Sequence, residues 1–180
     1  HLKPQYFNPY TTLQKAGHGS LVDLPNGESY LVHLCARPFV PELRCTLGRE
    51  TAIQKMKWTD DGWLRMTDGT NIAKEYTEES ALEEYPVSQI PDFDDFDSDI
   101  LGSWYYSPRI MPSCFADINA RKGYVRLRGQ ESRTSLNKVS ILARKLTSTY
   151  ATVTTKMEYI PEMPHQSAGL IFYYDNMNYI

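Results

Sequence analysis

Residues 51–58 limit the fold more than any other stretch, because two kinds of side chain alternate along them. In an extended chain, successive side chains point to opposite faces. One face would carry Ala52, Gln54, Met56 and Trp58, and the other Thr51, Ile53, Lys55 and Lys57. The Asp61-Gly62 pair then supplies the positive φ that a tight hairpin needs, and residues 63–66 return. The stretch predicts two antiparallel strands.

A second hairpin is predicted upstream. Residues 20–24 go out as one strand, residues 25–28 form a turn around Asn26-Gly27, and residues 30–35 come back. Asn-Gly is a strong hairpin signal between apolar segments. Together the two hairpins give about four strands within residues 17–66.

The pattern changes further along the chain. Residues 67–91 lose the alternation, residues 77–85 are acidic and predict one helical turn, and Pro86 and Pro91 stiffen an extended linker. Strand patterns resume in residues 92–180. Residues 123–128 and 151–159 alternate, whereas residues 168–174 are nearly all apolar, as in a central strand covered on both faces. Several such strands between Gly and Pro turns indicate a β-sandwich.

Composition excludes several classes of protein. A net charge of −3 over 180 residues gives no strong field for nucleic acid, and no run approaches the ~20 apolar residues that cross a membrane. Three scattered cysteines favour neither a disulfide framework nor a zinc site. Both ends read as mid-chain, so we expect a fragment of a longer protein. We expect a cytoplasmic location, although any signal peptide would precede residue 1.

The order of the motifs resembles a known family. GHGSLV, YLVHLCARP, RCTLGRETAIQKMKW and DDGW resemble the last blade of the five-bladed β-propeller of glycoside hydrolase family 43, in its β-xylosidase branch. WYYSPRI, YVRLRGQES, SILARK and AGLIFYYDNMNY resemble the jelly-roll, concanavalin-A-like β-sandwich that follows it. The resemblance implies an all-β fold, with a propeller blade in residues 1–66, a linker in 67–91 and the first part of the sandwich in 92–180.

The same resemblance implies an activity for the parent protein. It would be an exo-acting, inverting glycoside hydrolase that cleaves terminal β-1,4-xylose from xylo-oligosaccharides, and some relatives also cleave α-L-arabinofuranosides. Its Asp base, Glu acid and third Asp would come from earlier blades, before residue 1, so no catalytic residue is assigned here. No cofactor would be required, and we expect a homo-oligomer. The alternatives are a non-catalytic carbohydrate-binding module and a purely structural one.

Arg49 matches the family arginine that contacts sugar hydroxyls. A planar guanidinium can donate to adjacent hydroxyls and stays charged beside carboxylates. The alternative is a structural brace, in which Arg49 pairs with Glu50 or with the backbone. The resemblance favours the substrate-binding role.

His18 matches the family histidine at the propeller centre, beneath the sugar pocket. There it would bind substrate through the pocket floor or ligate a divalent ion such as calcium. Glycines on both sides let the backbone pass close to the axis. A lone histidine is more often a satisfied core group, and we expect that packing role for His33.

Other candidate sites are weaker. The run Asp95-x-Asp97-x-Asp99 lacks the glycine and glutamate of a calcium loop, so an acidic linker is expected. Glu50, Asp60 and Asp61 are expected to be structural or solvated. The consecutive aromatic residues 104–106 alternate faces on a strand, so they cannot form one sugar-stacking platform.

Overall fold

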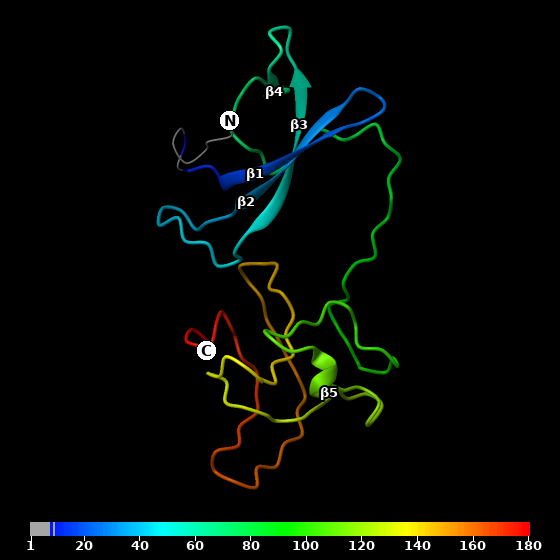
Figure 1. Ribbon diagram of the computed structural model, residues 1–180, viewed down its shortest axis with the longest axis vertical. Helices are drawn as coiled ribbons and strands as arrows, with labels where there is room; N and C mark the ends of the chain where they lie inside the picture. Colours follow the sequence, from blue (N-terminus) through cyan, green and yellow to red (C-terminus); the bar gives the residue numbers. More distant parts are fainter. Residues whose placement is uncertain (1–7, 9) are drawn as a thin grey trace. The chain divides into compact units, whose positions relative to one another are not determined.

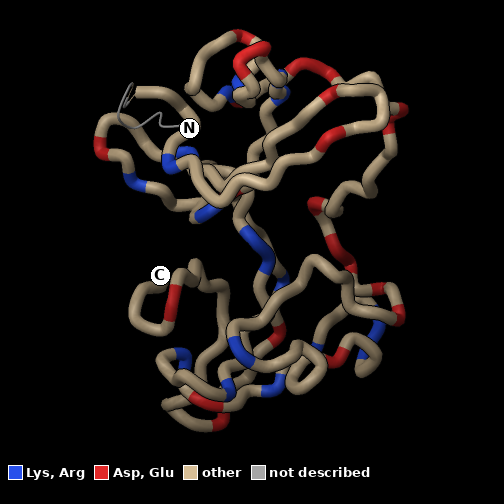
Figure 2. Tube along the Cα trace, turned by 45° about the horizontal axis from the view of Figure 1, so that its top comes forward, with Lys and Arg blue, Asp and Glu red and all other residues tan. Residues whose placement is uncertain are grey.

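The computed structural model describes residue 8 and residues 10–180. The chain divides into two units, one of His1–Pro86 with Thr147–Thr149 and one of Val87–Leu146 with Tyr150–Ile180. The domain limits predicted from the sequence stay a prediction. Lysine and arginine residues lie among acidic ones in both units (Figure 2). No helix in the described ranges is long and apolar enough to span a bilayer.

A twisted antiparallel sheet of four strands forms the first unit, with the strands in the order of the sequence (Figure 1). The strands are β1 (Gln14–Asp23), β2 (Ser29–Ala36), β3 (Glu50–Trp58) and β4 (Leu64–Met66). Both predicted hairpins are present. Gly27 and Gly62 have φ of 87° and 79°, as the two turns require.

The predicted alternation along β3 is confirmed. Gln54 and Met56 are buried and Ala52 is half-buried, whereas Ile53 is exposed. Trp58 departs from the pattern, because it lies at the end of the strand and is exposed. A small apolar cluster joins Leu13, Cys35 and Ala73, with Ala52 packed against it. One face of the sheet is therefore covered by a residue that precedes the first hairpin, Leu13, and by one that follows the second, Ala73.

The second unit has little regular structure. It contains a 3-10 helix, η1 (Pro112–Cys114), and two short paired strands, β5 (Ala116–Asp117) and β6 (Arg126–Leu127). Isolated bridges join Tyr106 to Ala143 and Tyr173 to Tyr179. Its most buried apolar side chains are Phe115, Ile118, Val139 and Ile141.

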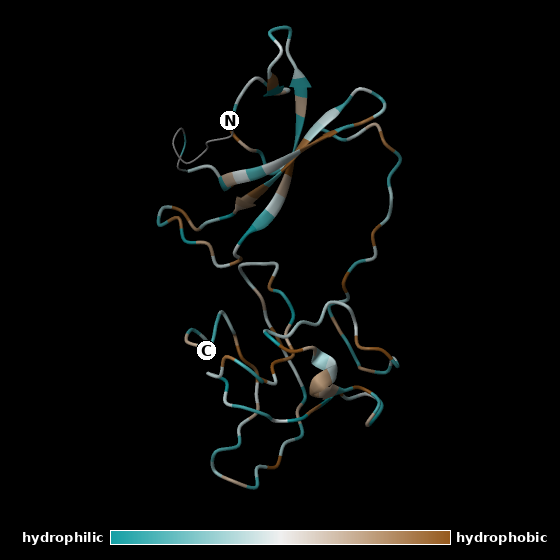
Figure 3. Ribbon diagram, viewed as in Figure 1, coloured by the Kyte–Doolittle hydropathy of each residue, from teal (hydrophilic) through white to brown (hydrophobic). Residues whose placement is uncertain are grey.

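Three local predictions are wrong. Residues 77–85 form no helical turn, and residues 151–159 and 168–174 form no strands apart from the bridge at Tyr173. The alternating residues 151–160 and the mostly apolar residues 168–174 run along irregular chain (Figure 3). Most of their side chains are exposed. A strand needs a hydrogen-bonded neighbour. Among the described residues no segment pairs with residues 151–159, and residues 168–174 have only the short pairing of Phe172 with Ile180 and of Tyr174 with Asn178.

The segment after β4 is fastened to the sheet by polar side chains. The buried amide of Gln54 donates to the carbonyl of Lys74 at 2.9 Å and accepts from its N–H at 3.1 Å. The backbone N–H of Lys55 donates to the hydroxyl of Thr77 at 2.9 Å. We call residues 74–82 the strap. These bonds satisfy polar groups that would be costly to bury unpaired.

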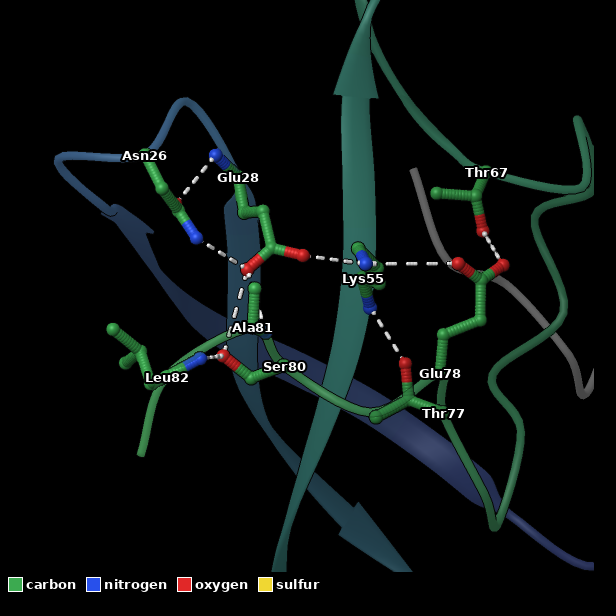
Figure 4. Close-up of polar contacts among 9 residues, drawn as sticks. All are labelled: Asn26, Glu28, Lys55, Thr67, Thr77, Glu78, Ser80, Ala81 and Leu82. Atoms are coloured by element: carbon green, nitrogen blue, oxygen red, sulfur yellow. Dashed lines mark hydrogen bonds and ion pairs between the residues drawn. The ribbon is translucent and has the colours of Figure 1, made fainter. Parts of the chain in front are cut away.

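Glu28 anchors the far end of the strap. Its carboxylate lies 2.6 Å from the ammonium of Lys55 and accepts the N–H of Ala81 at 3.1 Å. Asn26 donates to the same carboxylate at 2.9 Å. Figure 4 shows Glu28 and Glu78 on opposite sides of Lys55. Hydrogen bonds from Lys55, Asn26 and the backbone of Ala81 lower the pKa of Glu28 from 4.5 to about 2.

This network predicts acid sensitivity. The pKa of Glu28 is depressed in the folded state, so its ionised form stabilises the fold above pH 4.5, and this contribution is lost as the pH falls toward about 2. We expect Glu28→Gln in the full-length protein to lower the midpoint of thermal unfolding at pH 7, with a smaller difference from the wild type at each step between pH 4.5 and pH 2.

Glu83 offers the matched control, because it is exposed and forms no ion pair within the described part of the chain. Glu83→Gln should leave the midpoint unchanged at every pH. A deficit for Glu28→Gln that stays constant from pH 7 to pH 2 would contradict the assignment.

Two glycines in β1 give a second prediction. A Cβ on Gly19 would lie 2.9 Å from Cδ1 of Leu31, whereas a Cβ on Gly17 would meet nothing within 4 Å. Leu31 must move to accept Gly19→Ala, so we expect this variant to lose about 1 kcal/mol of unfolding free energy. Gly17→Ala should lose nothing, since it restricts the unfolded chain without a clash. Denaturant unfolding compares the two, and equal midpoints would refute the close packing of Gly19 on Leu31.

Candidate functional site

The two predicted site residues belong to the first unit. His18 lies within β1, beside the second half of β2, and Arg49 directly precedes β3. Gly17, Leu34 and Thr51 lie in line across β1, β2 and β3. His18 follows Gly17, and Arg49 precedes Thr51 by two positions. From a strand spacing of about 4.8 Å and a rise of about 3.3 Å per residue, their Cα atoms are roughly 14 Å apart. Two side chains and one sugar ring can bridge that distance.

His18 occupies an irregular point in β1. The register with β2 shifts between Gly17 and Ser20, and His18 has a φ of 43° inside this bulge. Positive φ is uncommon for a non-glycine residue, and bulges re-aim side chains next to functional sites. The imidazole is exposed and has no hydrogen bond to another described residue. The substrate role of His18 stays a prediction.

A metal role for His18 finds no partner ligands among these residues. The described residues contain no group of three His, Cys, Asp or Glu side chains that could hold an ion. Calcium takes six to eight oxygen ligands, so an ion at His18 would need ligands from other parts of the full-length protein. The metal role of His18 stays a prediction.

Arg49 stands at the end of the connection between β2 and β3. Gly48 has a φ of 75° and turns the chain just before it, and β3 begins directly after it. The side chain is exposed, and within the described part of the chain no hydrogen bond or ion pair engages its guanidinium. All of its donors are therefore available to a ligand.

Glu50 is already occupied, but by a different arginine from the one expected. Arg37 donates from Nη2 to Oε1 at 2.8 Å, and its Nε lies 3.1 Å from each carboxylate oxygen. These bonds from Arg37 lower the pKa of Glu50 and raise that of Arg37. The alternative brace between Arg49 and Glu50 is thus not formed. Arg37 was missed by the sequence analysis, although its RP motif lies in the segment that carries the family resemblance.

Two of the remaining acidic candidates have structural partners. Asp61 accepts from Thr59 and Arg65, which lowers its pKa to about 2. Asp99 pairs with Lys122 in the second unit. None of these carboxylates is free to act as a buried acid or base.

The buried histidine of the sheet is a packing residue. His33 is 2% exposed, and its Nδ1 lies 2.9 Å from the carbonyl of Leu34. Its Nε2 lies 3.4 Å from the amide nitrogen of Gln54. His33 therefore supports the amide that fastens the strap.

One cavity of the described residues belongs to the second unit. Its volume is about 480 Å³, and its polar lining includes Asp99, Asp117, Asn119 and Arg128. Asp117 caps the following turn through the N–H groups of Asn119 and Ala120. This cavity contains neither predicted site residue.

Comparison with known proteins gives two adjoining family matches. Residues 2–64 match glycosyl hydrolases family 43, and residues 93–180 match the beta xylosidase C-terminal concanavalin A-like domain. The all-β fold class, a propeller blade followed by a sandwich, is thereby confirmed. The concanavalin A-like match over residues 93–180 agrees with the sandwich predicted from the strand patterns of residues 92–180.

Individual relatives agree. The chain is 34% identical to a xylosidase/arabinosidase of Humicola insolens and 33% identical to a beta-xylosidase of Bacillus subtilis, over 96% and 97% of its own length. It covers 32% and 34% of those proteins, about a third. The chain is also similar to the crystal structure of xylan beta-1,4-xylosidase from Bacillus halodurans, with 47% sequence identity and a TM-score of 0.75. The match covers 82% of the present chain and 28% of the xylosidase chain. The chain therefore belongs to glycosyl hydrolases family 43.

Proposed function

We propose that the full-length protein is an exo-acting glycoside hydrolase that releases terminal β-1,4-linked xylose from xylo-oligosaccharides. The similarity to the xylan beta-1,4-xylosidase structure, at 47% identity, is the observation that carries this proposal. The beta-xylosidase of Bacillus subtilis supports it. Xylo-oligosaccharide is accordingly the proposed substrate class.

The reaction would proceed by single displacement with inversion. Such a reaction needs two carboxyl groups about 6.5–9.5 Å apart, one to protonate the leaving oxygen and one to activate water. Glu50, Asp61 and Asp99 are paired with cations. The resemblance to family 43 places the catalytic acids in the part of the full-length protein that this chain does not include.

In this proposal Arg49 binds the hydroxyls of the sugar being cleaved. Its guanidinium is exposed and unpaired within the described residues, and its planar fork can donate to two neighbouring hydroxyls. It would also favour ionisation of a nearby catalytic base. His18 would border the same pocket, because the neighbouring Gly17 stands in line with Thr51, two positions after Arg49.

A second activity, on α-L-arabinofuranosides, is favoured by the names of several relatives. The relatives in Humicola insolens and Butyrivibrio fibrisolvens are xylosidase/arabinosidases, and one in Bacteroides ovatus is a non-reducing end alpha-L-arabinofuranosidase. The ratio of rates on aryl xylosides and aryl arabinofuranosides would rank the two activities. A homo-oligomeric assembly and a cytoplasmic location stay predictions.

Arg49→Ala in the full-length protein tests the substrate role. We expect kcat/KM on xylobiose to fall by about 10²-fold or more, because a charge-assisted contact to the reacting sugar contributes about 2–4 kcal/mol. Steady-state xylose release measures the loss, and an unchanged unfolding midpoint shows that the fold is intact.

Arg44 provides the control, since it is an exposed arginine of the same connection whose backbone carbonyl accepts the N–H of Phe39. Arg44→Ala should change kcat/KM less than threefold. A similarly small loss for Arg49→Ala would refute the role of Arg49. A full-length protein that binds xylobiose without releasing xylose would instead support the non-catalytic alternative.

A further inference from the structure

An ion pair joins the two ends of the connection that carries Arg49. Arg37 is the first residue after β2, and Glu50 is the first residue of β3. Three donor–acceptor contacts of 2.8–3.1 Å link the guanidinium to both carboxylate oxygens. Residues 38–49 therefore form a loop that is closed at its base by side chains.

The strand register explains why these two residues meet. Cys35 and Glu50 are the last paired residues of β2 and β3. Arg37 lies two positions beyond Cys35, on the same face of the extended chain, and so becomes the diagonal neighbour of Glu50. A long side chain with a planar fork spans such a diagonal and fixes the orientation of the carboxylate.

The first half of the loop is ordered by its own backbone. The N–H of Phe39 donates to the carbonyl of Arg44 at 2.9 Å, and the N–H of Leu43 donates to the carbonyl of Phe39 at 2.7 Å. The second half, residues 45–49, has no backbone–backbone hydrogen bond among the described residues. The position of Arg49 consequently depends on Glu50, the next residue, which is fixed by β3 and by its ion pair with Arg37.

Stability does not account for this pair. The side chains of Arg37 and Glu50 are 47% and 26% exposed, and ion pairs in such positions contribute little to folding. Their geometry is nevertheless that of a two-pronged clamp. We therefore expect the pair to fix the orientation of the loop between Arg37 and Glu50.

We propose that Arg37 is a positioning residue, which with Glu50 clamps the base of the 38–49 loop so that the Arg49 guanidinium faces the sugar. The inference rests on the proposed role of Arg49. It assigns to Arg37 an effect on substrate binding that passes through Arg49, without contact between Arg37 and the sugar.

A double-mutant cycle in the full-length protein tests this inference. We expect Arg37→Ala to lower kcat/KM on xylobiose by about tenfold or more, because small misplacements of a substrate-positioning group are costly. In an Arg49→Ala background, Arg37→Ala should cost less than twofold, since the group that it orients is gone. Glu50→Gln, which keeps the shape but removes the charge, should behave as Arg37→Ala does.

Arg65 supplies the matched control. It pairs with Asp61 at 2.6 Å in the hairpin between β3 and β4, and its side chain is 49% exposed, close to the 47% of Arg37. Arg65→Ala should leave kcat/KM unchanged, and Arg37→Ala should shift the unfolding midpoint no more than Arg65→Ala does. For variants whose turnover is too slow to follow, calorimetric titration with xylose gives the same double-mutant cycle from the binding affinities.

The outcomes separate the two proposals. If Arg49→Ala is severe but Arg37→Ala is silent, or if their losses multiply in the double variant, Arg37 is not a positioning residue and the proposed function stands. If Glu50→Gln keeps near-wild-type activity while Arg37→Ala loses activity, the ion pair is not what positions Arg49, and the proposal is also refuted. If Arg49→Ala itself is silent, the role of Arg49 fails and the clamp fails with it.

Discussion

The pairing of β2 with β3 is the constraint on which the rest of the first unit depends. Seven consecutive residue pairs, from Ser29 with Met56 to Cys35 with Glu50, follow one another without a bulge. A slip of one residue would turn the buried face of β3 outward. It would also move Glu50 out of reach of Arg37. One register therefore determines both the packing of the sheet and the closure of the loop before Arg49.

The outer edge of β3 shows how the unit is completed without a long fourth strand. β4 pairs only with residues 56–58, so among the described residues the first part of β3 has β2 on one side and no strand on the other. The strap covers this edge through side chains: Gln54 bonds the backbone of Lys74, and Thr77 accepts the N–H of Lys55. An exposed edge invites pairing with other chains, and polar cover of this kind prevents it.

Prediction from the sequence succeeded where local chemistry decides the structure. Asn26-Gly27 and Asp61-Gly62 fix their turns through backbone conformation alone, and a period of two residues identifies the buried face of β3. It failed for residues 151–159, where the alternation is as regular but no described segment pairs with them. Periodicity reports which faces a strand would have, whereas its hydrogen-bonded neighbour is decided by tertiary structure.

The same distinction explains why the partner of Glu50 was missed. In sequence, Arg49 and Glu50 are neighbours, which suggests a brace between them. In an extended chain, however, consecutive side chains point apart, and the nearest reachable groups lie across the ladder or on its diagonal. Arg37 reaches Glu50 by that route from thirteen positions away. Because the carboxylate is already paired with Arg37, the guanidinium of Arg49 keeps all its donors, which the proposed contact with sugar hydroxyls would need.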